Sequence, residues 1–350
     1  MNDRPLETDP VPEGERAVSR LDRDFAEAAY PVSPAARNRW ILERRPARNA
    51  LDPWRPYAFV AETEAGPDGE AVDVATVFLT NRECPWRCVM CDLWRNTLEE
   101  TVPEGAIAAQ ILHALQRLPS IVPAHSHLKL YNAGSFFDPR AIPPEEYPAI
   151  ARLAAPFRRT IVECHPTLVG PRCLPFRELV SGRLEVAMGL ETVHPEVLER
   201  LNKHMTLEQF RRAAGFLRKE GIDLRAFILV RPPWLSEQEG VDWAKRSLDF
   251  AFDCAATVCS LIPTRPGNGA MESLIAAGEF TPPSLASLES VLEYGLGCRA
   301  GRVFADLWDV ETFSYCPECS DRRIRRMREM NATQKVPARL HCNRCDNVTS

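Results

Sequence analysis

The segment VATVFLTNRECPWRCVMCDLW, residues 74–94, joins a β-type run to three closely spaced cysteines. Its first eight residues are rich in Val, Thr and Phe, which is typical of a strand. Cys84, Cys88 and Cys91 follow with the spacing CxxxCxxC. Three thiolates of one loop can hold a [4Fe–4S] cube, which usually takes four cysteines. The next cysteine is Cys164, so one iron would keep an open position for chemistry.

The β-type run of segment 74–94 is the first of six that alternate with longer helical patterns. They are VATVFLTN (74–81), HLKLYNA (127–133), TIVECHP (160–166), LEVAMGLET (184–192), DLRAFILVRPP (223–233) and AATVCSLIPT (255–264). Strands that alternate with helices predict a parallel sheet of βα units. Six units are two short of a complete barrel of the TIM type. We therefore predict an α/β fold with a partial, TIM-like six-unit barrel.

Composition changes divide the chain into three parts. Residues 1–71 are rich in Pro, Arg and Glu and are expected to form an N-terminal arm or cap. Residues 72–311 carry the alternating pattern and are the expected barrel core. Residues 312–350 break this pattern and contain two CxxC pairs, so we expect a zinc-ribbon-like C-terminal extension.

The overall composition indicates in which cellular compartment the protein is expected. The chain has 350 residues, twelve cysteines and a formal net charge of −5 at pH 7. Its longest uncharged stretch, residues 105–116, is shorter than the roughly 18 apolar residues that a membrane span needs. The first residues contain no apolar segment of the signal-peptide type. We expect a cytoplasmic protein without membrane contact, in which clustered cysteines more often bind metal than form disulfides.

A CxxxCxxC triplet after the first strand of a six-unit barrel resembles the signature of the radical S-adenosylmethionine (SAM) enzymes. The resemblance implies that Cys84, Cys88 and Cys91 bind three irons of a [4Fe–4S] cluster, and that SAM chelates the fourth iron. It also implies that an electron from a reductant such as a flavodoxin or ferredoxin cleaves SAM. The products are methionine and a 5'-deoxyadenosyl radical that takes hydrogen from a substrate. Met90 departs from the family, which often has an aromatic residue at this position.

Polar residues follow the second predicted strand in the run YNAGSFFD. Ligands of barrel enzymes bind at the carboxyl ends of the strands, and a glycine lets the backbone approach a ligand closely. The family holds the amino group of SAM at this place, so the resemblance implies that Asn132, Gly134 and Ser135 contact SAM. Ser135 replaces the acidic residue that is usual there. An ordinary turn is the alternative interpretation.

Charged residues end the next three predicted strands. Glu163 and Glu191 follow apolar residues, where a carboxylate is costly unless it is paired or bound to a ligand. Arg231 is placed to face a carboxylate. We expect these three residues in the SAM or substrate site, with a structural salt bridge as the alternative. Cys164 lies at the same strand end as Glu163 and is a candidate hydrogen donor to a radical, although buried cysteines are more often inert.

Five further motifs indicate a branch of the family. They are GSFFD (134–138), VECHP (162–166), GLET (189–192), LNKHMT (201–206) and LIPTRPGNG (261–269). Together they resemble the Elp3/MiaB/NifB-type radical SAM core and, more distantly, the radical SAM subunit of archaeosine synthase. The resemblance covers roughly residues 72–298. It implies a substrate in tRNA or another RNA.

The C-terminal segment carries a second cysteine pattern, CPEC and CNRC. Two such hooks, Cys316 with Cys319 and Cys342 with Cys345, are typical of a tetrahedral structural zinc site. A second iron–sulfur cluster and metal-free thiols are the alternatives. The basic run DRRIRRMREM (321–330) lies between the hooks. It indicates either a contact with RNA phosphate or a solvated helix face.

Two other classes of protein fit parts of this pattern. A non-catalytic iron–sulfur electron carrier would also need the first cysteine triplet. A zinc-dependent nucleic-acid-binding protein would hold zinc at both cysteine groups. Iron content separates the second class from a radical SAM enzyme, and the release of 5'-deoxyadenosine separates the first.

Overall fold

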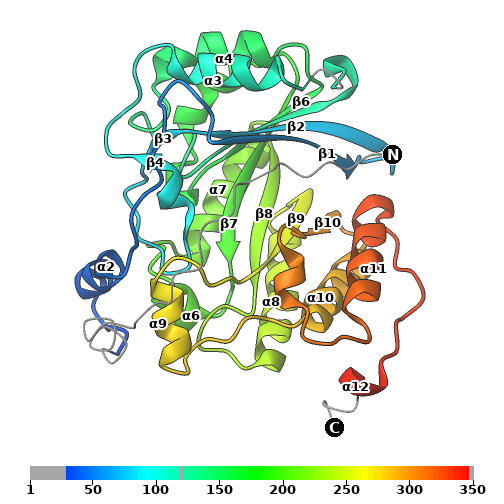
Figure 1. Ribbon diagram of the computed structural model, residues 1–350. Helices are drawn as coiled ribbons and strands as arrows, with labels where there is room; N and C mark the ends of the chain where they lie inside the picture. Colours follow the sequence, from blue (N-terminus) through cyan, green and yellow to red (C-terminus); the bar gives the residue numbers. More distant parts are fainter. Residues whose placement is uncertain (1–28, 119–120, 347–350) are drawn as a thin grey trace.

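The central element of the structure is an eight-stranded sheet in the order β1-β2-β5-β6-β7-β8-β9-β10 (Figure 1). The structure is a computed structural model that describes residues 29–118 and 121–346. The strands of this sheet are β1 (Ala58–Ala65), β2 (Ala71–Leu79), β5 (His127–Asn132), β6 (Arg159–Glu163), β7 (Arg183–Glu191), β8 (Asp223–Val230), β9 (Val258–Pro263) and β10 (Arg302–Ala305). A small second sheet pairs β3 (Asn81–Arg82) with β4 (Thr97–Leu98).

Six neighbouring strands, β2 and β5 to β9, correspond to the six predicted runs and all pair in parallel. The predicted fold class, a partial TIM-like barrel, is confirmed. Beyond these six strands, the sheet has one additional strand at each edge. Strand β1 pairs antiparallel with β2, and β10 pairs in parallel with β9. Strand β1 lies within the residues that the sequence assigns to the arm, and β10 has only four residues.

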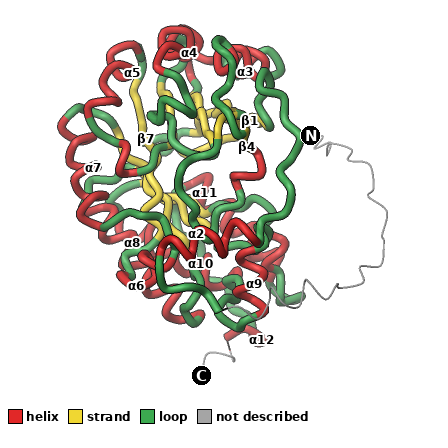
Figure 2. Tube along the Cα trace, turned by 90° about the vertical axis from the view of Figure 1, so that its left-hand side faces the viewer, coloured by secondary structure: helices red, strands yellow, loops and turns green. Residues whose placement is uncertain are grey.

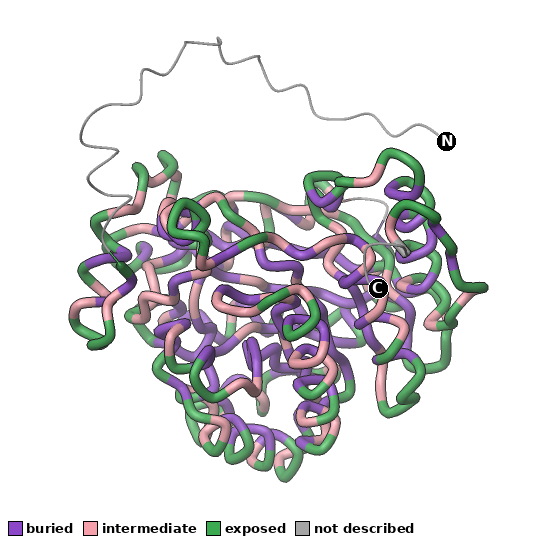
Figure 3. The backbone as a smooth tube through the Cα atoms, turned by 90° about the horizontal axis from the view of Figure 1, so that it is seen from below, coloured by how far each residue is buried: buried purple, intermediate pink, exposed green. Residues whose placement is uncertain are grey.

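The helices surround the curled sheet (Figure 2). They are α2 (Pro34–Glu43), α3 (Ala106–Leu115), α4 (Tyr147–Ala154), α5 (Leu174–Leu179), α6 (Pro195–Arg200), α7 (Leu207–Lys219), α8 (Glu237–Asp253), α9 (Ala270–Ala276), α10 (Leu285–Cys298), α11 (Ser320–Thr333) and α12 (Asn343–Asp346). Alternate strand residues face this layer; in β7, Leu184, Val186 and Met188 belong to the main apolar core. The buried segments accordingly run through the middle of the molecule (Figure 3).

The inner face of the sheet carries buried charges at the amino ends of the strands. Arg225 of β8 pairs with Glu64 of β1 at 2.9 Å and with Glu185 of β7 at 2.7 Å. Lys129 of β5 also pairs with Glu64, at 2.6 Å. Although burial alone would raise it, Arg225 and Lys129 hold the pKa of Glu64 well below its usual range. Because Glu64 contacts β8, the end of β1 reaches from one edge of the sheet toward the other and closes this end of the barrel.

The N-terminal segment covers the opposite, carboxyl end of the strands. Trp40 and Ile41 of α2 share an apolar cluster with Val89, which lies between the cysteines of the first triplet. Arg45 pairs with Glu83, directly before that triplet, at 2.7 Å. Residues 1–28 of the expected arm and residues 347–350 of the expected extension lie outside the described residues. No helix in the described ranges is long and apolar enough to cross a membrane.

The C-terminal segment packs on the barrel through α11, which lies beside α10 and β10 (Figure 1). Ile324, Met327 and Met330 of α11 belong to the main apolar core. At the end of α11, the side-chain amide of Asn331 accepts a hydrogen bond from Ala305 N (2.9 Å) and donates one to Ala305 O (2.8 Å). The first part of the expected extension is therefore built into the wall of the barrel.

Candidate active site

The loop that carries the first cysteine triplet follows β2 and β3 at the carboxyl edge of the sheet. Two asparagine side chains from distant parts of the chain hold its backbone. Asn202 donates a hydrogen bond to Arg87 O at 2.7 Å. Asn268 donates to Val89 O at 2.8 Å and to Cys91 O at 3.0 Å. The three cysteines are thus presented by a loop whose shape depends on the segments after α6 and β9.

The three cysteines are partly buried and form no disulfide. Burial raises the pKa of Cys84, raises that of Cys88 to about 12 and raises that of Cys91 well above its usual value. The thiolates that a metal requires are therefore unfavourable here without a nearby positive charge. A metal cation supplies such a charge and displaces the thiol protons.

The loop after β5 lies directly against the cysteine loop. A Cβ atom added to Gly134 would stand 3.0 Å from Cys84 Cβ, so glycine permits this close approach. Ser135 Oγ accepts a hydrogen bond from His165 N at 2.9 Å, which ties this loop to the end of β6. Asn132 is 1% exposed, and both polar atoms of its side chain lack a hydrogen-bond partner within the described residues. Such a buried amide is costly unless it meets a ligand or water.

The carboxylates of Glu163 and Glu191 have different surroundings. Glu163 Oε1 accepts a hydrogen bond from Asn132 N at 2.6 Å. Burial raises the pKa of Glu163 to about 8, although this hydrogen bond and the ammonium of Lys203 act in the opposite direction. Glu191 forms a buried ion pair with Lys203 at 2.6 Å. The backbone of Glu191 is left-handed, with φ +65°, a conformation that costs energy in a residue other than glycine.

Lys203 and His165 also belong to the site, although the sequence indicates only an ordinary capping or solvated role for His165 and does not distinguish Lys203. A Cβ atom added to Gly189 would stand 2.4 Å from Lys203 Nζ, so the glycine leaves room for the ammonium. His165 stacks on Trp86 with ring centroids 3.7 Å apart, and its Nε2 contacts Lys203 O at 2.9 Å. Burial and Lys203 lower the pKa of His165 to about 3, so its ring is neutral at pH 7. His165 lies in the motif VECHP and Lys203 in the motif LNKHMT, so these two motifs are the sequence features that point to both residues.

The side chains of the remaining candidates, Arg231 and Cys164, form contacts with other residues of the chain. The guanidinium of Arg231 pairs with Glu237 at the start of α8 and donates to Pro282 O at 2.9 Å. The thiol of Cys164 is buried and donates to His165 O at 3.4 Å, and burial raises its pKa well above the usual value. These contacts match the structural alternatives given for both residues.

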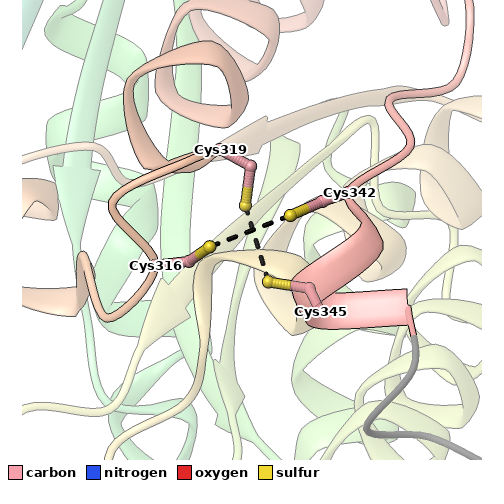
Figure 4. A group of neighbouring side chains, drawn as sticks. All are labelled: Cys316, Cys319, Cys342 and Cys345. Carbon is pink, nitrogen blue, oxygen red and sulfur yellow. Dashed lines mark hydrogen bonds between the residues drawn. The ribbon is translucent and has the colours of Figure 1, made fainter.

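The second cysteine group gathers before α11 and at α12, away from the triplet in the chain (Figure 4). The Sγ atoms of Cys316, Cys319, Cys342 and Cys345 all lie within 4.8 Å of one another. Among the described residues, this is the group of His, Cys, Asp or Glu side chains whose ligand atoms lie close enough together to share one metal ion.

The basic run between these cysteines is only partly solvated. Arg323 and Arg326 are buried and form ion pairs with Glu289 of α10. Arg322 and Arg325 are exposed. The expected basic surface of α11 is therefore smaller than its sequence indicates, because two of its arginines serve packing against α10.

Similarity to known proteins is low but covers more than half of the chain. No protein-family model matches the chain. The chain is 26% identical over 237 residues to archaeosine synthase subunit beta of Methanosarcina acetivorans, which covers 64% of this chain and 67% of the relative. It is 28% identical over 211 residues to archaeosine synthase subunit beta of Thermococcus kodakarensis, which covers 59% and 65%, respectively.

Two solved structures show the extent of the likeness in fold. Methylornithine synthase (PylB) has a TM-score of 0.49 at 13% identity, with 84% of this chain and 77% of that chain covered. The radical SAM methyltransferase TsrM of Kitasatospora setae has a TM-score of 0.38 at 17% identity, and the match spans only 36% of that chain and 53% of this one. The CxxxCxxC loop after the first parallel strand of a partial barrel, taken with the sequence relatives, indicates the family. In its cysteine loop and its partial barrel, the chain is similar to the radical SAM enzymes.

Proposed function

We propose that the protein is an enzyme in which Cys84, Cys88 and Cys91 hold a [4Fe–4S] cluster that cleaves SAM reductively. The observation that carries the proposal is the meeting of this loop with the buried, unpartnered amide of Asn132 at the carboxyl edge of the barrel. With cluster and SAM bound, the site would supply a carbon radical able to take hydrogen from a substrate. The residues described below bind and orient these groups.

The donor set fits a cluster better than a single ion. Cysteine thiolates are the usual ligands of iron–sulfur clusters. The sulfur atoms of the triplet do not all lie within 4.8 Å of one another, unlike those of the C-terminal cysteines. Thiolates that share one zinc ion must meet closely, whereas thiolates on different irons of a cube stand further apart. This argues against the alternative of zinc at the triplet.

Four residues of the site would hold SAM. Asn132 offers an amide donor and an acceptor, and Gly134 keeps the backbone close to Cys84. Glu163 carries a carboxyl group that a cationic ligand would help to ionise, because burial raises its pKa to about 8. Glu191 would act through its ion pair with Lys203. Arg231 is directed to Glu237 and has the weakest case.

The substrate and the partners belong to the same proposal. Two sequence relatives are named archaeosine synthase subunit beta, which supports tRNA as the first substrate to test and a second subunit as a partner. A flavodoxin or ferredoxin would deliver the electron in a cytoplasmic setting. Arg322 and Arg325 of α11 are exposed and available to an RNA, whereas the exposed Arg328 pairs with Glu311.

The release of 5'-deoxyadenosine tests the proposal. The protein is reconstituted anaerobically with iron and sulfide, then mixed with SAM and dithionite, and the products are separated by chromatography. We expect 5'-deoxyadenosine from the wild type and from the control Cys298→Ala, which changes an exposed cysteine on α10. We expect none from Cys88→Ala. A wild type that binds iron and sulfide but releases no 5'-deoxyadenosine would indicate an electron carrier instead.

A further inference from the structure

The four C-terminal cysteines come from two segments that are separated by α11 and its following loop. Cys316 and Cys319 precede α11, whereas Cys342 and Cys345 lie at the start of and within α12. The Sγ atoms of Cys316 and Cys342 are 3.8 Å apart, and those of Cys319 and Cys345 are 3.6 Å apart. All four sulfurs point toward one common centre (Figure 4). Each hook therefore contributes two sulfurs to the same small volume.

We propose that these four thiolates bind one zinc ion in a closed tetrahedral site. A Zn–S distance of about 2.3 Å places two sulfurs of a tetrahedron about 3.8 Å apart. The observed separations of 3.8 and 3.6 Å agree with this edge length. Four protein ligands leave no open position, so the ion has a structural role.

The same distances argue against the other occupants of the site. In a [4Fe–4S] cube each cysteine binds a different iron, so its sulfurs stand at the outside of a larger body. The limit of 4.8 Å for every pair leaves no room for that body. A disulfide needs sulfurs about 2.05 Å apart, and the twelve cysteines, all within the described residues, form none. One ion of tetrahedral preference fits the four sulfurs.

An arginine beside the site connects it to the barrel. Arg323 Nε donates a hydrogen bond to Cys319 Sγ at 3.3 Å, and its guanidinium also pairs with Glu289 of α10. A donor to a metal-bound sulfur orients the ligand and offsets the negative charge of the tetrathiolate centre. Arg323 is thus a positioning residue, and the ion fastens the segment from Leu340 to Cys345 against the start of α11.

Metal analysis of the full chain tests the proposal. We expect one zinc per chain in the wild type and in the variant with Cys84, Cys88 and Cys91 all changed to Ala, which excludes zinc at the triplet. We expect Cys342→Ser to lose at least nine-tenths of this zinc, and the control Cys298→Ser to keep it. If Cys342→Ser does not fold, cobalt exchange into the wild type keeps the test decisive. Tetrahedral thiolate coordination should then give intense visible d–d absorption.

The role of Arg323 has its own measurement. Arg323→Lys keeps the positive charge but removes the Nε–H donor, so zinc affinity in competition with a chelating dye should fall about 10- to 100-fold. The matched control Arg322→Lys changes an exposed residue of the same helix and should leave the affinity unchanged. An equal affinity of both variants would overturn the role of Arg323. Iron in the triple-Ala variant, disulfides between these cysteines, or reduced thiols without metal would overturn the zinc site.

Discussion

The side chain of Asn268, in the segment between β9 and α9, holds the cysteine loop, and Asn268→Ala should loosen this loop. Asn268 is 3% exposed and lies between Gly267 and Gly269. Its amide donates to Val89 O and Cys91 O, and its Oδ1 accepts from Met271 N at 2.8 Å. The Ala variant removes two hydrogen bonds to the cysteine loop and one that caps the start of α9.

The expected loss follows from the number of these bonds. A hydrogen bond contributes about 1 kcal/mol net, and a buried partner left unpaired costs about 1–3 kcal/mol. Some of the three partners will find water, so we expect a loss of about 3–4 kcal/mol in the free energy of unfolding. That is less than the ~5–15 kcal/mol stability of an ordinary domain. Asn268→Ala should therefore fold but hold its cysteine loop poorly.

The assay is the iron and sulfide content after anaerobic reconstitution, combined with urea denaturation. Asn268→Asp should be worse than Asn268→Ala, because its second carboxylate oxygen faces two carbonyl oxygens where the amide donated. Asn49→Ala is the control, since its amide makes an exposed hydrogen bond with Asn96. Wild-type iron content and stability in both Asn268 variants would refute the role of this amide.

Three further predictions concern the site and the wall of the barrel. Glu163→Gln should be more stable than the wild type at pH 9 by a few kcal/mol and should gain nothing below pH 4.5. The reason is that the wild type loses stability as the pH rises from the usual pKa of 4.5 through the raised pKa of about 8. Urea denaturation midpoints measured across this pH range check this prediction. Gly189→Ala should cost about 1–3 kcal/mol by displacing the paired Glu191 carboxylate and Lys203 ammonium, whereas Gly215→Ala, which meets no atom within 4 Å, should not destabilise. Removal of residues 312–350 should lower Tm strongly or abolish soluble expression, because α11 supplies three side chains to the main core; thermal denaturation of the truncated chain measures it.

The parallel strands could be predicted because their sequence pattern follows from local packing. Strands β2 and β5 to β9 are short runs of apolar and β-branched residues between helical patterns, and each run is found in the sheet. The cysteine triplet lies where a barrel places its reactive groups, at the carboxyl end of the first parallel strand. Gly134 was predicted to let the backbone approach SAM, which stays a prediction; the structure shows that it lies against Cys84.

The contacts that complete the site could not be read from local patterns. Lys203 meets Glu191 twelve positions away, and Asn268 meets Cys91 across 177 positions. A lysine in a polar motif resembles an ordinary surface residue, and an asparagine between two glycines indicates a turn or a close approach but not which backbone the asparagine binds. Their burial depends on segments that only the fold brings together. The same reason explains β1, whose Glu64 is paired with Lys129 inside the barrel although AFVAETEA reads as a polar arm.

The edge of the sheet explains why the C-terminal segment belongs to the barrel. Strand β10 is an edge strand, and an edge exposes unpaired N–H and C=O groups that invite association with other chains. Gln334 bonds Val303 N and O, and Asn331 bonds Ala305 N and O, so two side-chain amides occupy the places of a neighbouring strand. The apolar face of α11 then covers the same edge. Truncation before α11 would thus expose β10, and aggregation of the truncated chain should exceed the effect of removing Cys342 alone.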